Sequence, residues 1–397
     1  MKPTHKICHT LIMLALPLAS CIPNTLVSQE ANTVRFATFN VSFNRKSEGQ
    51  LKSDLEKADT INPKRIAEII QRVRPDVILL NEFDYDPGGE GIAHFASKHL
   101  AVSQNGQKPI TYKHVFFRPV NTGVDSGQDL NGDGKKSTPN DAFGFGVFPG
   151  QYAMVVLSKY EIDESNSRTF QKFLWKDMPN CLWPIDPETK KPYYNDEIKK
   201  IFRLSSKSHW DVPIKVGNKT IHFLTCHPTP PVFDGDEDRN GRRNHDEIRF
   251  FADYISPDKS DYIYDDQGKK GGLNPGSHFV IAGDLNADEV DGDSSQNAAK
   301  LLTTHPMINH EKTPESEGAV YYAKQQGKVN AKQNGNPAFD TGDFNDFSVG
   351  NLHLDYCLPS KTLTVKDSGV FWPKPDQSGG DLVKASDHRM VWVDLEK

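Results

Sequence analysis

An aspartate and an asparagine follow a strongly apolar run in the second half of the chain. The run begins at His278 and ends in Asp284 and Asn286, which are separated by one leucine. Residues two apart on a strand face the same side, so both side chains can contact one ligand. A buried carboxylate is costly unless a cation or hydrogen bonds compensate it. The pattern therefore indicates either a chemical site or, since Gly, Asp and Asn favour turns, an ordinary strand end.

The same arrangement recurs at the ends of other predicted strands. These carry Asn40 in strand 34–41, Glu82 in 76–83, His227 after 220–226, Asp355 in 353–359, and Asp387 with His388 before 389–395. Strand ends of an α/β sheet are where loops assemble binding and catalytic sites. Recurrence on separate strands therefore favours a chemical site over a set of unrelated turns.

The elements that must position these residues alternate between strands and helices. Asn62 and Pro63 suit the N-cap and first position of a helix, and Asn244 followed by Glu247 predicts a second helix start. Further helices are expected near 91–102 and 294–304, and further strands near 114–120, 152–158, 161–169, 203–216, 278–285 and 363–371. Long loops or insertions are expected at 121–150, 171–201 and 228–243, and 311–350 has an irregular polar pattern. This mixture predicts two packed sheets with helices outside.

The first twenty residues have the pattern of a targeting segment. Lys2 and Lys6 form a basic start, and residues 7–18 are an apolar stretch too short to span a bilayer comfortably. Leu18 to Cys21 resembles the lipobox of bacterial lipoproteins, in which cleavage exposes Cys21 for lipid attachment. An ordinary signal peptide cut nearby is the alternative.

The domain organisation follows from this leader. We expect a signal peptide at 1–20, a tether at 21–32 and one catalytic domain at 33–397. The mature protein would be lipid-anchored on the periplasmic or outer face of a bacterial cell envelope, or secreted. Of the remaining cysteines Cys181, Cys226 and Cys357, the latter two lie in strand patterns and are expected as free thiols, with one disulfide among the three as the alternative.

The net charge argues against one class of function. The whole chain carries −6, and removal of the leader with its two lysines leaves −8. Proteins that bind nucleic acid chiefly through phosphates usually display a basic field. A nucleic-acid partner is therefore not favoured, although it stays an alternative.

Six short motifs, taken in order, resemble those of the endonuclease/exonuclease/phosphatase superfamily. They are Thr38 to Asn40, Leu80 to Glu82, Thr225 to His227, Gly283 to Asn286, Leu354 to Tyr356 and Ser386 to His388. The superfamily includes pancreatic deoxyribonuclease, apurinic endonucleases, inositol polyphosphate 5-phosphatases and sphingomyelinases. The resemblance covers nearly all of the mature chain. It implies a four-layer α/β sandwich like that of deoxyribonuclease I, in which two mixed β-sheets pack face to face with helices outside.

The resemblance also implies hydrolysis of a phosphoester with a divalent cation, usually Mg²⁺ and alternatively Mn²⁺. Magnesium binds through few carboxylates, with waters and substrate phosphate completing its shell. Glu82 would be the first ligand, with Asn40 beside it and Asp387 completing the protein's share. Asp284 would orient or deprotonate the attacking water, and Asn286 would hold a phosphate oxygen or that aspartate.

Two histidines complete the predicted constellation. His227 and His388 would stabilise charge on the reacting phosphoryl group or protonate the departing oxygen. Asp355 would orient a histidine, expected to be His388, and fix its tautomer. The alternatives are structural histidines and a satisfied structural aspartate.

Other polar residues are candidates with a plain alternative beside each. Arg203, Lys207 and His209 could bind substrate phosphate or form an exposed polar face, and Arg243 and His245 could contact an anionic substrate or belong to a solvated loop.

An acidic loop offers a different kind of site. Asp129, Asn131 and Asp133 match the first half of a calcium-binding EF-hand loop, but position twelve is Asn140 rather than glutamate. A structural Ca²⁺ site and an acidic turn without metal both fit.

The combined interpretation is a metal-dependent phosphoester hydrolase that uses an activated water. A phosphodiesterase or phosphatase on a soluble substrate is favoured, and phospholipid headgroups or nucleic acid are the alternatives, because the insertions leave the substrate open. A hypothesis from another class is a binding module that kept the fold and lost catalysis. That hypothesis predicts gaps in the constellation, and the sequence contains every motif.

Overall fold

The computed structural model describes Met1 and residues 32–397. The rest of the predicted signal peptide, Cys21 and the tether up to residue 31 lie outside the described residues. Within the described part, the helices are all too short or too polar to cross a membrane. Cys226 and Cys357 are free thiols, as expected, and Cys181 is free as well.

The first sheet is built around β1, a long strand that is buried over most of its length. β1 pairs in parallel with β2 and antiparallel with β14. The strand order is β13-β14-β1-β2-β4-β3. The bounds are β1 Thr33–Phe43, β2 Val77–Phe83, β3 His114–Phe116, β4 Met154–Ser158, β13 Val365–Val370 and β14 Val391–Glu396.

The second sheet has the order β12-β9-β8-β7-β5, with β6 paired to β7. Its central strands β8 and β9 are parallel, and β12 runs antiparallel to β9. The bounds are β5 Glu161–Ile162, β6 Arg168–Thr169, β7 His209–Val216, β8 Lys219–Cys226, β9 His278–Asp284 and β12 Asp355–Pro359. A small separate pair joins β10 Gly342–Asp343 to β11 Asn351–Leu352.

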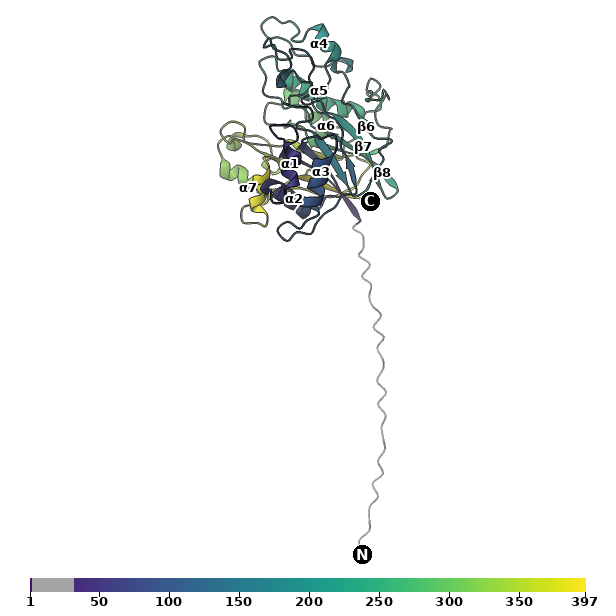
Figure 1. Ribbon diagram of the computed structural model, residues 1–397, viewed down its shortest axis with the longest axis vertical. Helices are drawn as coiled ribbons and strands as arrows, with labels where there is room; N and C mark the ends of the chain where they lie inside the picture. The colour runs from purple at the N-terminus through teal and green to yellow at the C-terminus, as the bar shows by residue number, and fades with distance from the viewer. Residues whose placement is uncertain (2–31) are drawn as a thin grey trace. The chain divides into compact units, whose positions relative to one another are not determined.

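The two sheets pack face to face and helices cover their outer faces (Figure 1). Between the sheets, the ring centroids of Phe36 and Phe223 are 5.3 Å apart, within one apolar core. Helices α1 Gln50–Glu56, α2 Ile61–Val73 and α3 Glu90–His94 pack on the first sheet, and α5 Arg239–Tyr254 and α6 Lys300–Thr303 pack on the second. The predicted four-layer α/β sandwich is therefore confirmed.

Several predicted elements have different bounds in the structure. The helix near 91–102 is α3 followed by a π-helical turn at Phe95–Leu100, and the helix near 294–304 retains only α6 after a 3₁₀ turn at Ser295–Asn297. The strand expected at 161–169 is interrupted between β5 and β6, and the strand expected at 203–216 begins only at His209. The helix expected after Asn62 begins at Ile61, with Thr60 as its N-cap. Inside the insertion 171–201, α4 covers Asp196–Ile201.

Two predictions about helices were wrong. Asn244 does not begin a helix, because α5 starts at Arg239 and the Asn244 side chain is buried inside it. The irregular region 311–350 contains α7 Glu317–Gln326, which Ser316 caps by accepting a hydrogen bond from the N–H of Gly318. The buried residues of α7 are small, so its sequence carries little apolar periodicity.

Candidate active site

The strand ends that the sequence singled out meet at one end of the sandwich. The register of the first sheet places Asn40 beside Asn81, and the next residue is Glu82. In the second sheet, Asp355 at the start of β12 lies opposite Asp284 at the end of β9. The parallel pair β8 and β9 brings the residue after β8, His227, to the same end. Residues from both sheets therefore converge.

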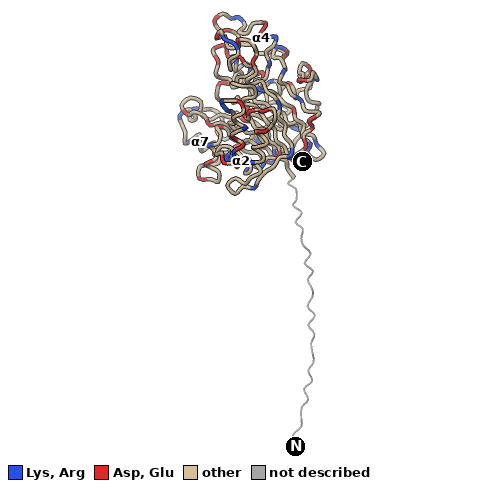
Figure 2. Tube along the Cα trace, viewed as in Figure 1, with Lys and Arg blue, Asp and Glu red and all other residues tan. Residues whose placement is uncertain are grey.

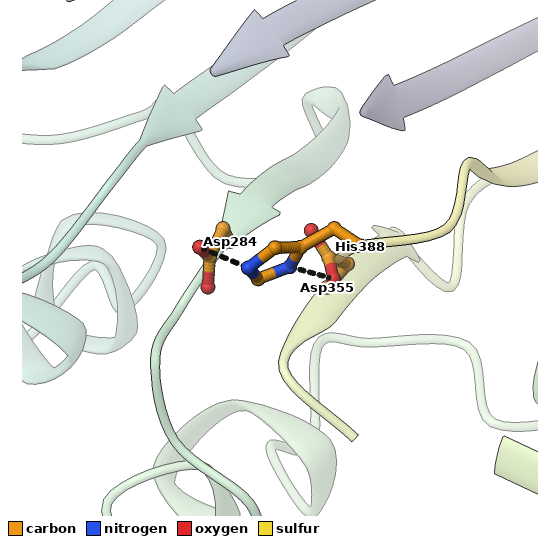
Figure 3. Close-up of side chains that lie close together, drawn as sticks. All are labelled: Asp284, Asp355 and His388. Carbon is orange, nitrogen blue, oxygen red and sulfur yellow. Dashed lines mark hydrogen bonds and ion pairs between the residues drawn. The ribbon is translucent and has the colours of Figure 1, made fainter. Parts of the chain in front are cut away.

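His388 lies between two buried carboxylates (Figure 3). Its Nδ1 is 2.8 Å from Oδ2 of Asp355, and its Nε2 is 3.6 Å from Oδ2 of Asp284. The hydroxyl of Thr341 donates to the same Asp355 oxygen at 2.9 Å. Although burial opposes it, the two carboxylates raise the pKa of His388 well above its ordinary value. His388 is therefore held as an imidazolium.

Asp284 receives hydrogen bonds from several sides. Asn40 Nδ2 donates to its Oδ2 at 3.1 Å, and the backbone N–H of Asn286 donates to its Oδ1 at 2.9 Å. Burial raises the pKa of Asp284 to about 6, and the charge of His388 opposes this rise. A carboxylate with this pKa can exchange a proton near neutral pH.

His227 contrasts with His388. Its Nε2 lies 3.5 Å from Oδ2 of Asp284, and its Nδ1 is buried without a hydrogen-bond partner. Burial lowers the pKa of His227 well below its ordinary value, and the charges of Lys207 and His388 add to this effect. The site thus holds one cationic and one neutral imidazole around the same aspartate, an arrangement that separates acid and base roles.

Glu82 sits at the end of β2 in the left-handed region, with φ 59°. Such a conformation is uncommon for a residue other than glycine and is a form of strain found at functional sites. The neighbouring Asn81 bridges the sheets, since its Oδ1 accepts from Thr38 at 3.2 Å and its Nδ2 donates to the carbonyl of Cys226 at 3.4 Å. Burial raises the pKa of Glu82, while His388 and Asn40 oppose the rise.

Oxygen atoms suited to a divalent cation gather beside Glu82. Asn40 Oδ1 accepts one hydrogen bond, from the N–H of Ser42 at 3.1 Å, and an amide oxygen has two lone pairs. Asp387 is exposed and accepts from the hydroxyl of Ser42 at 3.0 Å, and its charge acts on Glu82. Two carboxylates and one amide oxygen, with solvent access at Asp387, fit the preference of magnesium for few protein oxygens and several waters.

A second acidic group has the right spacing for a metal but a different chemistry. Atoms of Asp284, Asp355 and His388 all lie within 4.8 Å of one another. However, the imidazole between the two carboxylates carries a proton on each nitrogen in its cationic form, so it has no free lone pair for a metal. This group is better suited to proton transfer than to metal binding.

The structure does not bring four of the additional substrate-binding candidates to the site, namely Arg203, His209, Arg243 and His245. Both ring nitrogens of buried His209 are engaged, by Ser205 Oγ and the carbonyl of Glu247, and burial lowers its pKa to about 3. Arg243 is buried and donates to main-chain carbonyls at Leu204 and Phe143.

The other two candidates also have local partners. Arg203 donates to Asn121 Oδ1 at 2.6 Å, and Nδ1 of His245 is 3.0 Å from Asp246 Oδ1. His209, Arg243 and His245 thus contact residues in or around α5, and Arg203 contacts the loop at 121–150. A charged side chain in a strand or helix pattern does not by itself show which way it faces.

The acidic loop at 129–133 has the geometry of a turn. The Asp129 carboxylate accepts from the N–H groups of Gly132 and Gly134 at 2.7 and 2.8 Å. Asp133 accepts from the N–H of Lys135, and Asn131 accepts from the N–H of Asp133. The side-chain oxygens are thus used within the turn itself, which favours the alternative without metal, and the calcium site stays a prediction.

Helix α5 contributes positioning residues that sequence reasoning missed. Asn244 Nδ2 donates to the carbonyls of Thr229 and Leu285, both at 2.8 Å. Glu247 accepts from the N–H of Ser206 at 2.6 Å and from the N–H of Thr229 at 2.7 Å. The two side chains tie together the loops that follow His227 and Asp284. The only sequence signal was their spacing, which is also that of a helix N-terminus.

Gly283 permits the close approach of β8 and β9 at the site. A Cβ atom at this position would lie 2.0 Å from the carbonyl oxygen of Cys226. Any larger residue would push Asp284 away from His227, so glycine is required by the contact between the strands.

Comparison with known proteins supports the fold, and the matched residues include the whole site. A model of the Endonuclease/Exonuclease/phosphatase family matches residues 37–388, a range that includes all of the residues gathered at this end of the sandwich. No curated protein matches the chain by sequence.

Several solved structures are similar to this chain in fold, at low sequence identity. An endonuclease/exonuclease/phosphatase from Beutenbergia cavernae DSM 12333 has 18% identity and a TM-score of 0.50, over 92% of this chain and 71% of that one. TDP2 from Caenorhabditis elegans has 15% identity and a TM-score of 0.44, over 92% and 74% of the two chains. Beta toxin from Staphylococcus aureus has 13% identity and a TM-score of 0.44, over 91% and 99%. At these identities the likeness concerns the fold alone.

Proposed function

Because this chain belongs to the endonuclease/exonuclease/phosphatase family, whose members are mostly hydrolases of phosphoesters, we propose that it hydrolyses a phosphoester with water as the nucleophile. The observation that carries the proposal is the arrangement around Asp284. A cationic His388 and a neutral His227 both face a carboxylate whose pKa is raised to about 6. Phosphoryl transfer needs an oriented water and stabilisation of charge, and this arrangement supplies both.

The residues have distinct roles in the proposed reaction. Asp284 takes a proton from water as the water oxygen bonds to phosphorus. The bond from phosphorus to the leaving oxygen breaks, and that oxygen takes a proton from His388. Asp355 keeps His388 oriented through its 2.8 Å contact at Nδ1. Asp284 can return the proton to His388, because Oδ2 and Nε2 are 3.6 Å apart.

Glu82, Asn40 and Asp387 would hold a divalent cation, Mg²⁺ or Mn²⁺. Such an ion, when bound, supplies positive charge that neutralises the phosphoryl oxygens. The elevated pKa of Glu82 is consistent with this role, because burial disfavours its charged form and a bound cation would favour it. The family typically uses a divalent metal, and the oxygen set described above fits one.

A phosphodiester or phosphomonoester of a soluble compound is the favoured substrate. Acidic and basic residues are intermixed along the described trace, and the net charge of the whole chain is −6 (Figure 2). A nonspecific nuclease would be served by a basic field. The leader and Cys21 support placement on the cell envelope through a lipid anchor, where such an enzyme would act on phosphoesters outside the cytoplasm.

Hydrolysis assays with the purified full-length protein test the proposal. Bis-p-nitrophenyl phosphate, p-nitrophenyl phosphate and plasmid DNA are compared in the presence of Mg²⁺, Mn²⁺, Ca²⁺ or a chelator. We expect hydrolysis of a small phosphoester that stops with chelator and in Asp284→Asn. Asp261→Asn, an exposed aspartate after α5, is the matched control and should behave as wild type. Nicking of plasmid DNA alone would favour the nuclease, and no activity on the panel with any metal would favour the binding module.

A further inference from the structure

A buried lysine that the proposed mechanism does not use lies beside the site. Lys207 is 6% exposed and lies two residues before the start of β7. Its ammonium donates to the main-chain carbonyl of Pro228 at 3.4 Å, and within the described residues no carboxylate forms an ion pair with it. A buried ammonium is costly unless it is paired and hydrogen-bonded. Among the described residues, Lys207 is therefore a buried ammonium with a hydrogen bond to a carbonyl and no ion pair.

The contacts of Pro228 fix where that cation lies. Pro228 follows His227 directly, and its carbonyl also accepts a hydrogen bond from Asn286 Nδ2 at 3.1 Å. The ammonium of Lys207 and the amide of Asn286 thus converge on one carbonyl oxygen. Both donors therefore lie next to His227 and the loop that follows Asp284.

Electrostatic interactions lead to the same location. Burial lowers the pKa of Lys207, and the charges of Glu247, Glu82 and Asp284 oppose this effect. In turn, the charge of Lys207 helps to lower the pKa of His227. The cation therefore acts on both the predicted metal ligand and the predicted base.

The nearby carboxylates are already engaged with other donors. Glu247 accepts from the N–H groups of Ser206 and Thr229, and Asp284 accepts from Asn40 and the N–H of Asn286. An ammonium has three N–H donors. One long hydrogen bond to a carbonyl leaves it short of acceptors and of negative charge.

We propose that Lys207 binds a non-bridging phosphoryl oxygen of the substrate, together with the amide of Asn286. The proposal rests on the phosphoester hydrolysis proposed above. It names Lys207 as the second positively charged side chain of the site, beside His388. An anionic phosphoryl oxygen provides a hydrogen-bond acceptor with negative charge in direct contact with the ammonium, which no carboxylate of the described residues does. The anion compensates Lys207 only when substrate is bound.

The test is Lys207→Met in the full-length protein, which removes the charge and keeps much of the aliphatic volume. We expect kcat/KM for the hydrolysed nitrophenyl ester to fall by about 100-fold, because one charge-assisted hydrogen bond to the substrate is lost. We expect the inhibition constant of inorganic phosphate to rise in parallel. The melting temperature should stay the same or rise, because an uncompensated buried charge has been removed.

This combination separates a binding role from a structural one. If Lys207 mainly supported the fold, Lys207→Met would lower the melting temperature and activity together, and that result would overturn the proposal. Wild-type kcat/KM and phosphate inhibition in Lys207→Met would overturn it as well. Lys215→Met is the matched control, because Lys215 is exposed on β7 and paired with Glu161. It should leave activity and phosphate inhibition unchanged.

A direct binding measurement keeps the proposal testable if the proposed hydrolysis fails. Titration of the wild-type protein with inorganic phosphate in the presence of Mg²⁺, followed by calorimetry, should show binding that is at least about tenfold weaker in Lys207→Met. Absence of catalysis with this difference would refute the hydrolase and retain the anion site. Equal phosphate binding by the two proteins, or none by either, would refute the anion site.

Discussion

Two clusters of buried charge on the second sheet differ in how completely their polar atoms are satisfied. Beneath α5, Arg168 donates to Asp265 at 2.8 Å, to the hydroxyl of Tyr254 at 3.1 Å and to the carbonyls of Gly271 and Lys269, both at 2.7 Å. At the end of the sandwich, polar atoms of His227 and Asp355 are buried without partners.

The difference shows how a structural cluster can be told from a site. A buried charge that has all its partners within the protein has no position left for a ligand. Buried polar atoms without hydrogen-bond partners at the site lower the stability of the fold. Such atoms are retained where a ligand supplies the missing contacts. We therefore expect changes in the two clusters to have opposite effects on stability and activity.

The largest expected effect is that of Asp284→Asn. Loss of the base should lower kcat/KM by about 1,000-fold. Since burial raises the pKa of Asp284 to about 6, its charged form is unfavourable in the fold, so the melting temperature should not fall. Steady-state kinetics and thermal unfolding measure the two effects. A variant that loses activity only because it unfolds would abolish the contrast between the clusters.

Arg168→Met should have the opposite profile. It leaves Asp265 buried without its partner, and removal of one member of a buried pair costs about 3 kcal/mol or more in the free energy of unfolding. Activity per folded molecule should be unchanged, because the cluster lies apart from the site residues. Urea unfolding combined with kinetics at low temperature checks this. Loss of activity in fully folded protein would mean that the two clusters are coupled.

Glu247→Gln should fall between these two variants. An amide has one oxygen in place of two, so the substitution removes an acceptor for the N–H of Ser206 or of Thr229. We expect kcat to fall by about tenfold with KM little changed, and the free energy of unfolding to fall by about 1 to 2 kcal/mol. Glu247→Ala should be worse in both respects. Equal loss in the two variants would show that the carboxylate geometry does not matter.

The pH dependence sharpens the account of Asp284 itself. Its pKa is raised to about 6, and the proposed base is active as the carboxylate, so kcat/KM should fall tenfold per pH unit below about pH 6. The effect of pH on stability has the opposite sign to its effect on kcat/KM. A carboxyl whose pKa is raised in the folded state contributes stability that is present at low pH and lost as pH rises through about 6. A rate profile from pH 4 to 8 tests the first effect, and comparison of wild type with Asp284→Asn in thermal unfolding tests the second.

The smallest effect is expected in the acidic loop. Asp133→Asn should leave hydrolysis unchanged and the melting temperature close to that of wild type, because the Asp133 carboxylate caps the N–H of an exposed turn. Addition of Ca²⁺ should not alter thermal unfolding in either protein. A calcium-dependent rise in the melting temperature that is lost in Asp133→Asn would establish the calcium site instead.

Much of the fold could be predicted because local patterns were strong. The apolar run before Asp284 became β9, and the helix predicted to start at Asn62 and Pro63 became α2, displaced by two residues at its start. By contrast, Asn244 and Glu247 have the spacing of a helix start but lie inside α5. Their side chains hold neighbouring loops, and a local pattern contains no information about such distant partners.

The candidate site shows the same division. Sequence reasoning named the eight side chains that the structure brings together, because each stands at or near one end of a predicted strand. It also offered Arg203, His209, Arg243 and His245, whose polar atoms have local partners within the protein. Residue type alone could not separate these from Lys207, whose ammonium contacts the carbonyl of Pro228 next to His227. Thr341, which donates to Asp355, lies in a region that was expected to be irregular.

The sequence by itself determined which residue types stand at the strand ends and in what order, because strands and turns depend on neighbours only a few residues away. The tertiary structure decided which of those residues meet. The parallel pairing of β1 with β2 and of β8 with β9, together with the face-to-face packing of the two sheets, brings Asn40, Asp284 and His388 into contact. The tertiary structure also decided the charges of the two histidines. Nearby carboxylates make His388 cationic, whereas burial leaves His227 neutral.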